Sequence, residues 1–318
     1  MTETSAALVA GLKQEIARHI VGQDYMVERL MVALISNGHV LLEGVPGLAK
    51  TRTLQVLTSC LDAKMSRVQF TPDLLPADLI GTEVFRPQSG EFVLRRGPIF
   101  TNLLLADEIN RAPAKVQSAL LQAMQERQVT IGEETLTLPD PFLVLATQNP
   151  IEQEGTYPLP EAQLDRFLMK IKVTYPAREE ELQILKLFDR EQIDRSDPTR
   201  VLSLHQLLDL RRQALEVFID PKIDAYIVAL VRASRDPNSV GLKGLIEWGA
   251  SPRASLALKS CARSLAFLRG ASFVTPDEVK EVAYDVLRHR ILTTFEAEGR
   301  GIDSDEVIRV LLKSTTVP

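Results

Sequence analysis

A phosphate-binding pattern lies early in the chain, in the segment Leu41-Leu42-Glu43-Gly44-Val45-Pro46-Gly47-Leu48-Ala49-Lys50-Thr51. The apolar run at its start predicts a buried parallel strand, and the glycines and proline that follow predict a tight loop before a helix. In such a loop, backbone N–H groups and the positive end of the helix converge on a polyphosphate, a lysine reaches the β- and γ-phosphates, and a threonine hydroxyl ligates Mg²⁺. Lys50 and Thr51 stand at the positions for these two roles.

The segment departs from the strict phosphate-loop pattern at one position. That pattern has glycine directly before the lysine, whereas this chain has Ala49. An alanine fits there if its φ is negative and its Cβ points away from the phosphates, and we predict that conformation. A short Gly-Pro-Gly loop followed by lysine also arises as an ordinary strand-to-helix turn, so this segment alone leaves both interpretations open.

A second motif supports the first. The segment Thr101-Asn102-Leu103-Leu104-Leu105-Ala106-Asp107-Glu108-Ile109-Asn110-Arg111 predicts a hydrophobic strand that ends in two acidic residues. Asp107 is expected to hold Mg²⁺ through its water shell, and Glu108 to polarise the water that attacks the γ-phosphate. Because the two motifs occur in this order and are separated by one crossover, they indicate a nucleoside-triphosphate hydrolase. Two such strand ends arising by chance are the less favoured interpretation.

Asn149 follows a further predicted strand, the apolar run 142–147. In open α/β sheets, a polar residue at the carboxyl end of a central strand lies beside the site, so Asn149 is placed to orient the attacking water. A turn-forming asparagine before Pro150 is the alternative.

Two arginines later in the chain are candidates for acting on the phosphates. Arg166 follows the start of a short helix in the segment 159–167; it either pairs with a nearby carboxylate such as Asp165 or reaches the γ-phosphate of a neighbouring subunit, as arginine fingers do. Arg253 falls in the first turn of a predicted helix, where the helix dipole disfavours a cation. That placement indicates a function, with an ordinary surface arginine as the alternative.

The first part of the chain alternates helices and strands around the phosphate loop. Amphipathic patterns predict helices at 6–19 and 25–37, and a third from Lys50 to about Cys60. Between the first two helices, Val21 and Gly22 break the pattern and predict an apolar patch with exposed amides, against which a purine ring could lie.

Two hairpins are predicted within this part, at 83–94 and 128–138, because strand-like residues flank a glycine-containing turn in each. A helix at 113–127 lies between them, and 169–173 is the last predicted strand. From Tyr175-Pro176 onward the signals are helical, with N-cap residues at Ser203, Asp220, Ser251, Thr275 and Ser304. We therefore expect an α/β nucleotide-binding domain over residues 1–190 and an all-helical lid domain over 191–318.

Composition excludes several classes of protein. The chain has 318 residues, 45% of them hydrophobic and 25% charged, and a net charge of −5, which is typical of a globular protein and argues against a non-specific nucleic-acid binder. It begins with no signal-peptide pattern and contains no apolar run of membrane-spanning length, so we expect a cytoplasmic protein. Cys60 and Cys261 lie far apart and no histidine cluster occurs, so both thiols are expected to be buried and inert.

Taken together, these segments resemble the AAA+ ATPases, and within them the MoxR family. The resemblance rests on the Gly22-Gln23 entry, the phosphate loop, the acidic strand end, Ala146-Thr147-Gln148-Asn149-Pro150, Leu159 through Phe167, and Ser251-Pro252-Arg253-Ala254. Alanine before the lysine is similar to the MoxR form of the loop. The resemblance thus covers nearly the whole chain.

The resemblance implies roles for the individual residues. Lys50 and Thr51 are the Walker A residues, Asp107 and Glu108 the Walker B pair, and Thr51 and Asp107 the metal ligands. It also implies that Asn149 is sensor 1, Arg166 the arginine finger and Arg253 sensor 2, acting on its own nucleotide or a neighbour's. The nucleotide-binding set comprises Val21, Gly22, Gly44, Val45, Pro46, Gly47, Leu48, Ala49, Lys50, Thr51 and Arg52.

The resemblance further implies ATP and Mg²⁺ as cofactors, a hexameric ring, and remodelling or maturation of a client protein, often with a von Willebrand factor A-domain partner. The hairpin at 83–94 resembles the helix-2 insert, and that at 128–138 the pre-sensor-1 hairpin. Two other functions are compatible with the same residues. One is the motor of a metal-chelatase or DNA-remodelling complex; the other is a nucleotide-switched assembly module with negligible turnover, against which the intact Glu108 argues.

Overall fold

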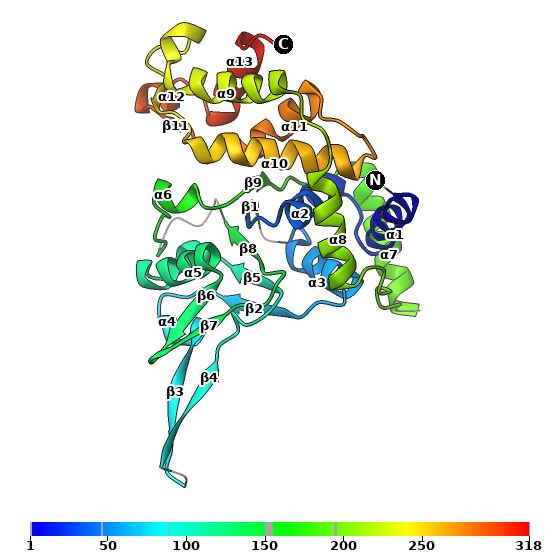
Figure 1. Ribbon diagram of the computed structural model, residues 1–318, viewed down its shortest axis with the longest axis vertical. Helices are drawn as coiled ribbons and strands as arrows, with labels where there is room; N and C mark the ends of the chain where they lie inside the picture. The colour runs from blue at the N-terminus through cyan, green and yellow to red at the C-terminus, as the bar shows by residue number, and fades with distance from the viewer. Residues whose placement is uncertain (1, 46, 89, 150–154, 194–195, 318) are drawn as a thin grey trace.

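The computed structural model describes residues 2–45, 47–88, 90–149, 155–193 and 196–317. Within these ranges, five parallel strands form the central sheet, in the order β2-β5-β8-β1-β9 (Figure 1). Their bounds are β1 Val40–Glu43, β2 Met65–Gln69, β5 Leu103–Asp107, β8 Leu143–Gln148 and β9 Met169–Lys172. The predicted α/β core with a parallel sheet is confirmed.

Alternate side chains of the central strands supply two separate hydrophobic cores. In β5, Leu103 and Leu105 belong to one buried cluster, whereas Leu104 and Ala106 belong to the other. A parallel sheet is covered on both faces, so its strands need apolar residues at every position. This is why β1, β5 and β8 are largely apolar in the sequence, whereas the edge strands β2 and β9 also carry exposed or half-buried polar residues.

Helices cover both faces of the sheet. The helices of the first part are α1 Glu3–His19, α2 Asp24–Ser36, α3 Lys50–Cys60, α4 Pro76–Ile80, α5 Ala114–Glu126, α6 Glu161–Leu164 and α7 Arg178–Ile193. Buried residues of α1, α2 and α3 join the first core, and those of α4 and α5 join the second. This arrangement agrees with the predicted α/β domain, and the ends of the predicted helices lie within a few residues of the observed ones.

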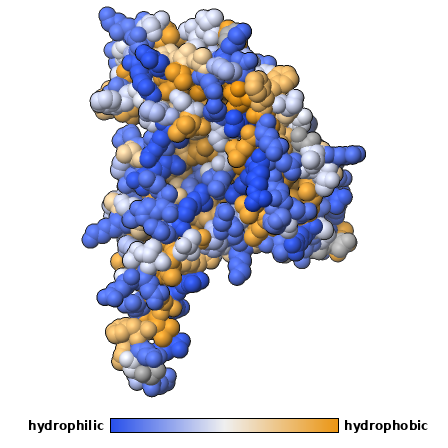
Figure 2. Space-filling model, viewed as in Figure 1, coloured by the Kyte–Doolittle hydropathy of each residue, from blue (hydrophilic) through white to orange (hydrophobic). Residues whose placement is uncertain are grey.

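Both predicted hairpins are present. They consist of β3 Gly81–Arg86 with β4 Glu91–Arg96, and β6 Gln128–Ile131 with β7 Glu134–Thr137. The first projects far from the body of the molecule (Figure 1), and its surface carries hydrophobic as well as polar residues (Figure 2). Phe85 and Phe92 face each other across this hairpin with ring centroids 5.2 Å apart, and both are exposed.

In the ranges that the structure describes, the second part of the chain is mainly helical, but it also contains a two-stranded sheet and an isolated bridge between Phe218 and Phe273, so it is not all-helical as predicted. Its helices are α8 Leu204–Leu215, α9 Pro221–Arg235, α10 Pro252–Leu268, α11 Pro276–Leu287, α12 Phe295–Gly299 and α13 Ser304–Ser314; β10 Ile246–Trp248 and β11 Leu292–Thr293 form the sheet. Four of the predicted N-caps form, but Asp303 rather than Ser304 caps α13. The division at residue 190 stays a prediction; it falls in the last turn of α7.

A buried ion-pair network joins the second part to the first. Arg29 of α2 donates to Asp285 of α11 over 2.8 Å, and both side chains are almost fully buried. Arg288, the C-cap of α11, also donates to Asp285, over 2.9 Å, and to the carbonyl of Lys170 in β9, over 2.7 Å. These contacts fix α11 against both α2 and the sheet.

Within the described ranges, no helix is long and apolar enough to cross a membrane. Cys60 and Cys261 are both buried and unpaired, as predicted, and burial raises the pKa of Cys60 to about 11 and that of Cys261 to about 12.

Candidate functional site

The phosphate loop joins β1 to α3 through two residues with positive φ. Gly47 has a φ of +87°, which glycine adopts at no steric cost. Ala49 has a φ of +55° and is the N-cap of α3, so the negative φ predicted for it is wrong. The conformation costs an alanine roughly 1–2 kcal/mol. It is held because the Ala49 carbonyl accepts two hydrogen bonds from Thr53, at 2.8 Å from the backbone N–H and 3.0 Å from the hydroxyl.

The start of the loop is equally constrained. A Cβ at Gly44 would lie 2.7 Å from the carbonyl oxygen of Val173, so a larger residue does not fit there. Val45 packs against the first core, while Pro46 lies outside the described residues. Lys50 donates from Nζ to the carbonyl of Gly44, over 2.6 Å. Its side chain thus curls back over the loop in which phosphates would lie.

Lys50 sits in a mixed electrostatic environment. Burial lowers its pKa, and the negative charges of Asp107 and Glu108 oppose that effect. A lysine that is costly to desolvate beside two carboxylates gains from an added anion, because the anion stabilises its charged form. This arrangement suits a ligand that brings phosphates to Lys50.

The two acidic residues lie at the carboxyl end of β5, next to β8. The hydroxyl of Thr147 in β8 donates to Asp107 Oδ1 over 2.7 Å and accepts from the backbone N–H of Glu108 over 2.9 Å. Glu108 has a φ of +56° and a ψ of 53°, the left-handed conformation that non-glycine residues rarely adopt. Such strain is often found at functional sites.

Three further side chains contact these carboxylates. Arg67 of β2 donates to Asp107 Oδ2 over 2.7 Å. Glu108 Oε2 accepts from Gln69 of β2 over 2.7 Å and from Arg111 over 3.0 Å. Both carboxylates therefore already have partners within the chain.

The end of the phosphate loop, the start of α3 and the carboxyl ends of β2, β5 and β8 line one cleft of about 410 Å³. Its lining residues are Gly47, Leu48, Ala49, Lys50, Thr51, Arg52, Arg67, Gln69, Asp107, Glu108, Thr147 and Asn149. The structure thus brings the predicted lysine, threonine, acidic pair and asparagine together at the carboxyl edge of the sheet. Asn149 is 7% exposed, which leaves its side chain little freedom.

A second cleft, of about 370 Å³, adjoins the first and shares Gly47, Leu48, Ala49 and Arg52 with it. Its other lining residues come from the α1–α2 connection and from α7 with the segment before it: His19, Ile20, Val21, Gln23, Tyr175, Pro176, Glu181, Ile184, Leu187 and Phe188. Most of these are apolar, which suits the face of a purine ring. Of the predicted pair, Val21 lines the cleft.

Gly22 has a structural role beside this cleft. It has a φ of +73°, and a Cβ there would lie 2.9 Å from the Cβ of Pro176. Arg52 lies between the two clefts, where it donates to the carbonyl of His19 over 3.1 Å and pairs with Glu191 of α7. Arg52 therefore ties the phosphate-loop helix to both walls of the second cleft.

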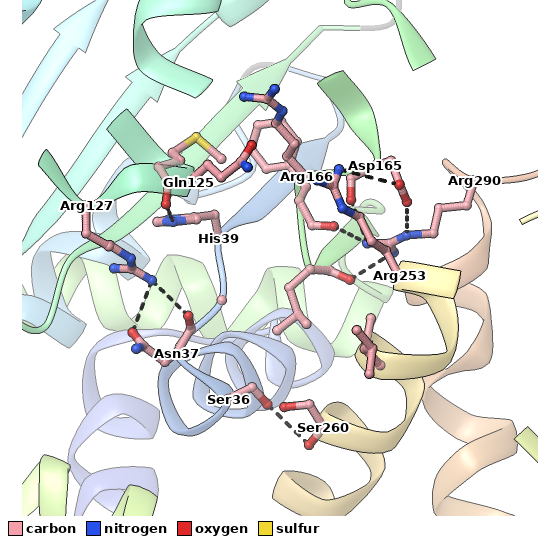
Figure 3. A pocket seen from close by; sticks show the side chains of 16 residues that line it. Ser36, Asn37, His39, Gln125, Arg127, Asp165, Arg166, Arg253, Ser260 and Arg290 are labelled. Atoms are coloured by element: carbon pink, nitrogen blue, oxygen red, sulfur yellow. Dashed lines mark hydrogen bonds and ion pairs between the residues drawn. The ribbon is translucent and has the colours of Figure 1, made fainter. Parts of the chain in front are cut away.

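Arg166 and Arg253 line neither of these clefts. They lie together in a third pocket, of about 410 Å³, formed by residues of α2, α5 and α10 and by the segments that follow α2, α5, α6 and α11 (Figure 3). Arg166 donates to the carbonyl of Leu121 over 3.1 Å, and Arg253 lies 3.7 Å from Asp165, which also binds Arg290 over 2.8 Å. The hydrogen bond observed for the Arg166 side chain is thus to a backbone carbonyl and not to the neighbouring Asp165.

The donor set at the first cleft fits Mg²⁺. Among the described residues, no group of three or more His, Cys, Asp or Glu could hold a metal ion. Mg²⁺ does not require such a cage, because it keeps several waters and is bound by one or two carboxylates together with substrate phosphates. Asp107 and Thr51 could supply the protein ligands, and the guanidinium of Arg67 at Asp107 Oδ2 shows that this oxygen accepts a cation.

Sequence reasoning missed several residues of the two clefts. Arg67 and Gln69 belong to β2, whose sequence Met65–Gln69 has no recognisable chemical pattern. Ile184, Leu187 and Phe188 belong to α7, where apolar side chains at helical spacing indicate packing as readily as binding. The one local signal of a missed site residue was Thr147, because it places a hydroxyl in the buried part of a strand that is otherwise apolar there.

Comparison with known proteins agrees with this geometry. The profile of the "ATPase family associated with various cellular activities (AAA)" matches residues 39–169, and that of the AAA lid domain matches residues 243–310. Chaperone MoxR1 of Mycobacterium tuberculosis is 50% identical over 96% of this chain and 81% of its own length. The uncharacterized protein YeaC of Bacillus subtilis is 42% identical over 96% of this chain and 93% of its own.

A solved structure shares the whole fold. It is a crystal structure from Cytophaga hutchinsonii whose name gives ATPase as a proposed activity; it is 45% identical, covers 99% of this chain and 96% of its own, and superposes with a TM-score of 0.93. The phosphate loop, the acidic pair and these relatives lead to the same conclusion: this chain is a member of the MoxR family of AAA+ ATPases.

Proposed function

We propose that this protein hydrolyses ATP in a Mg²⁺-dependent reaction at the interface between subunits, and couples hydrolysis to chaperone-like remodelling of a partner protein. The observation that carries the proposal is the continuity of the two clefts through Gly47, Leu48, Ala49 and Arg52. One cleft suits a triphosphate and the other an apolar ring. The choice of ATP over GTP rests on the family.

The roles of the residues follow from their positions. Lys50 and the amides of the loop and the α3 N-terminus bind the phosphates. Mg²⁺, held by Thr51 and Asp107, would neutralise charge on the phosphates. Glu108 accepts a proton from the attacking water, and Asn149 orients that water.

Arg166 and Arg253 are proposed to act on the nucleotide of a neighbouring subunit. They share a pocket with each other and not with Lys50. The buried pair Arg29–Asp285 holds α11 against α2, and Arg290, just beyond α11, binds Asp165 beside Arg166. Both arginines thus line a pocket separate from the phosphate cleft of their own subunit, which supports action on a neighbour's nucleotide and a ring of subunits. The hexameric state rests on the family.

The remodelling role rests on relatives and on the surface. One relative at 50% identity is named a chaperone, and families of this kind often act with a von Willebrand factor A-domain partner. A nucleic-acid motor is less well supported, because the arginines of β3 and β4 are accompanied by Glu83 and Glu91, and Arg86 lies opposite Glu91 in the register.

The test is ATPase rate against protein concentration with Mg²⁺, together with light scattering for mass. A specific rate that rises as higher oligomers form supports a site completed between subunits. A specific rate that stays constant while the protein remains monomeric contradicts the interface mechanism. The absence of any ATP hydrolysis contradicts the proposed ATPase activity.

A further inference from the structure

One buried hydroxyl contacts both acidic residues of the phosphate cleft. Thr147 is 2% exposed and stands in β8, the strand that lies between β5 and β1 in the sheet. The register pairs Ala106 of β5 with Ala146 of β8, which brings the residues that follow, Asp107 and Thr147, side by side. Thr147 therefore lies where the Walker B strand ends.

The hydroxyl uses its donor and one acceptor position on adjacent residues. It donates to Asp107 Oδ1 over 2.7 Å and accepts from the Glu108 N–H over 2.9 Å. With Oδ1 occupied, Asp107 presents Oδ2 to the cation beside it, which in this structure is the guanidinium of Arg67. The hydroxyl thus holds the Asp107 carboxylate in the orientation in which Oδ2 faces the cation.

The second bond acts on the backbone of Glu108. That residue holds a left-handed conformation, which is unfavourable for a non-glycine residue and persists only where surrounding contacts impose it. The bond from its N–H to Thr147 is such a contact, and it fixes the direction in which the Glu108 side chain leaves the chain. Oε2 then reaches Gln69 of β2 over 2.7 Å.

We infer that Thr147 is a positioning residue for hydrolysis, which aligns the metal ligand Asp107 and the general base Glu108 through one hydroxyl. This inference rests on the proposed function, because the roles of Asp107 and Glu108 belong to it. It differs from a packing role in one respect that can be tested. Valine has nearly the shape of threonine and would preserve packing, but it would leave Asp107 Oδ1 and the Glu108 N–H without this partner.

The experiment compares Thr147→Val with Thr147→Ser, which keeps the hydroxyl. For Thr147→Val we expect kcat to fall about 10- to 100-fold, the range typical of removing a group that orients a metal ligand. We also expect the Mg²⁺ concentration for half-maximal rate to rise, and the affinity for ATP, measured by equilibrium binding, to change less than twofold. Thr147→Ser should recover most of the rate.

The matched control is Thr58→Val, which removes a buried hydroxyl that donates to the Leu54 carbonyl within α3, over 2.6 Å. It should leave kcat unchanged. Equal rates for Thr147→Val and wild type would overturn the inference, and so would equal losses in Thr147→Val and Thr147→Ser. A loss of ATP affinity as large as the loss of rate would indicate general damage to the site and also overturn it.

A second readout does not need ATP turnover. Amide hydrogen exchange at Glu108 in the nucleotide-free protein should be faster in Thr147→Val than in wild type, and similar to wild type in Thr147→Ser. If wild type fails to hydrolyse ATP, the proposed function is wrong, whereas unchanged exchange at Glu108 in Thr147→Val refutes the hydroxyl bridge itself.

Discussion

Arg29 and Asp285 form a 2.8 Å ion pair with 1% and 0% of their side chains exposed, although they lie on helices from opposite ends of the chain. Tyr25 and Arg288 also donate to Asp285, over 2.6 and 2.9 Å, so the carboxylate is surrounded by donors. A buried pair of this kind depends on the presence of both partners. The helical part is therefore held in one position relative to the sheet.

Removing one partner should be strongly destabilising. We expect Asp285→Ala to lower the free energy of unfolding by about 3 kcal/mol, because Arg29 loses the fully buried carboxylate that faces it. Glu28 and Glu281 still contact Arg29, over 2.8 and 3.0 Å, which keeps the loss at the low end for a broken buried pair. Urea denaturation measures this loss. The matched control is Asp224→Ala, which breaks the surface pair with Lys259 at 2.8 Å and should cost at most about 1 kcal/mol. Equal costs for the two variants would contradict a special role for the buried pair.

Glu108→Gln should separate binding from chemistry. The amide is nearly isosteric and keeps the acceptor oxygen, so ATP affinity should stay close to that of wild type. Hydrolysis should stop or fall by about 10²- to 10⁴-fold, because the amide cannot accept the proton of the attacking water. Equilibrium binding and phosphate release measure the two quantities. Unchanged turnover would remove Glu108 from the mechanism.

Mixing two inactive variants tests whether Arg166 acts between subunits. Arg166→Ala keeps an intact cleft and Lys50→Ala keeps an intact arginine, so each alone should be inactive. In a mixed ring, some interfaces combine the intact cleft of one subunit with the intact Arg166 of the next, and ATPase activity should reappear. Failure to recover activity at every mixing ratio, with mixed oligomers shown to form, would count against this action.

Stability should fall as the pH drops below about 6.5, and His39 is one cause. Burial and the charge of Arg127 lower its pKa from 6.5 to about 3, so in this window the unfolded chain takes up a proton that the folded chain does not. The stability His39 contributes is present above pH 6.5 and is lost toward pH 3, by about 1.4 kcal/mol per pH unit. Its Nδ1 accepts from the Val144 N–H over 3.0 Å, which the neutral ring allows.

Urea denaturation between pH 7.5 and 5 measures this dependence. His39→Gln should give a shallower slope, although its stability at neutral pH is lower. A slope in His39→Gln as steep as that of wild type would contradict the buried neutral ring.

The phosphate loop and the acidic strand end could be predicted because their function depends on local order along the chain. A strand, a loop and a helix that follow one another place Lys50 and Thr51 at the start of the helix, beside the loop amides, whatever the rest of the fold is. The acidic end of β5 could also be predicted from the sequence, because Asp107 and Glu108 follow an uninterrupted apolar run. The two hairpins were predictable for the same reason.

Features that depend on neighbouring strands could not be predicted in this way. Arg67 meets Asp107 only because β2 pairs with β5 in this register, which no local pattern of β2 reveals. The conformation of Ala49 depends on how β1 passes into α3, and the rule that alanine avoids positive φ pointed to the wrong answer. The shared pocket of Arg166 and Arg253 depends on how the helical part packs against the sheet.

The projecting β3–β4 hairpin has a consequence for how such a protein can change over generations. Its exposed residues Val84, Phe85 and Phe92 belong to neither hydrophobic core, so substitutions there should cost little stability. The phosphate cleft, by contrast, depends in the proposed function on particular side chains such as Lys50, Asp107 and Glu108. Substitutions can therefore accumulate on the exposed surface of the hairpin while the residues of the nucleotide site stay the same.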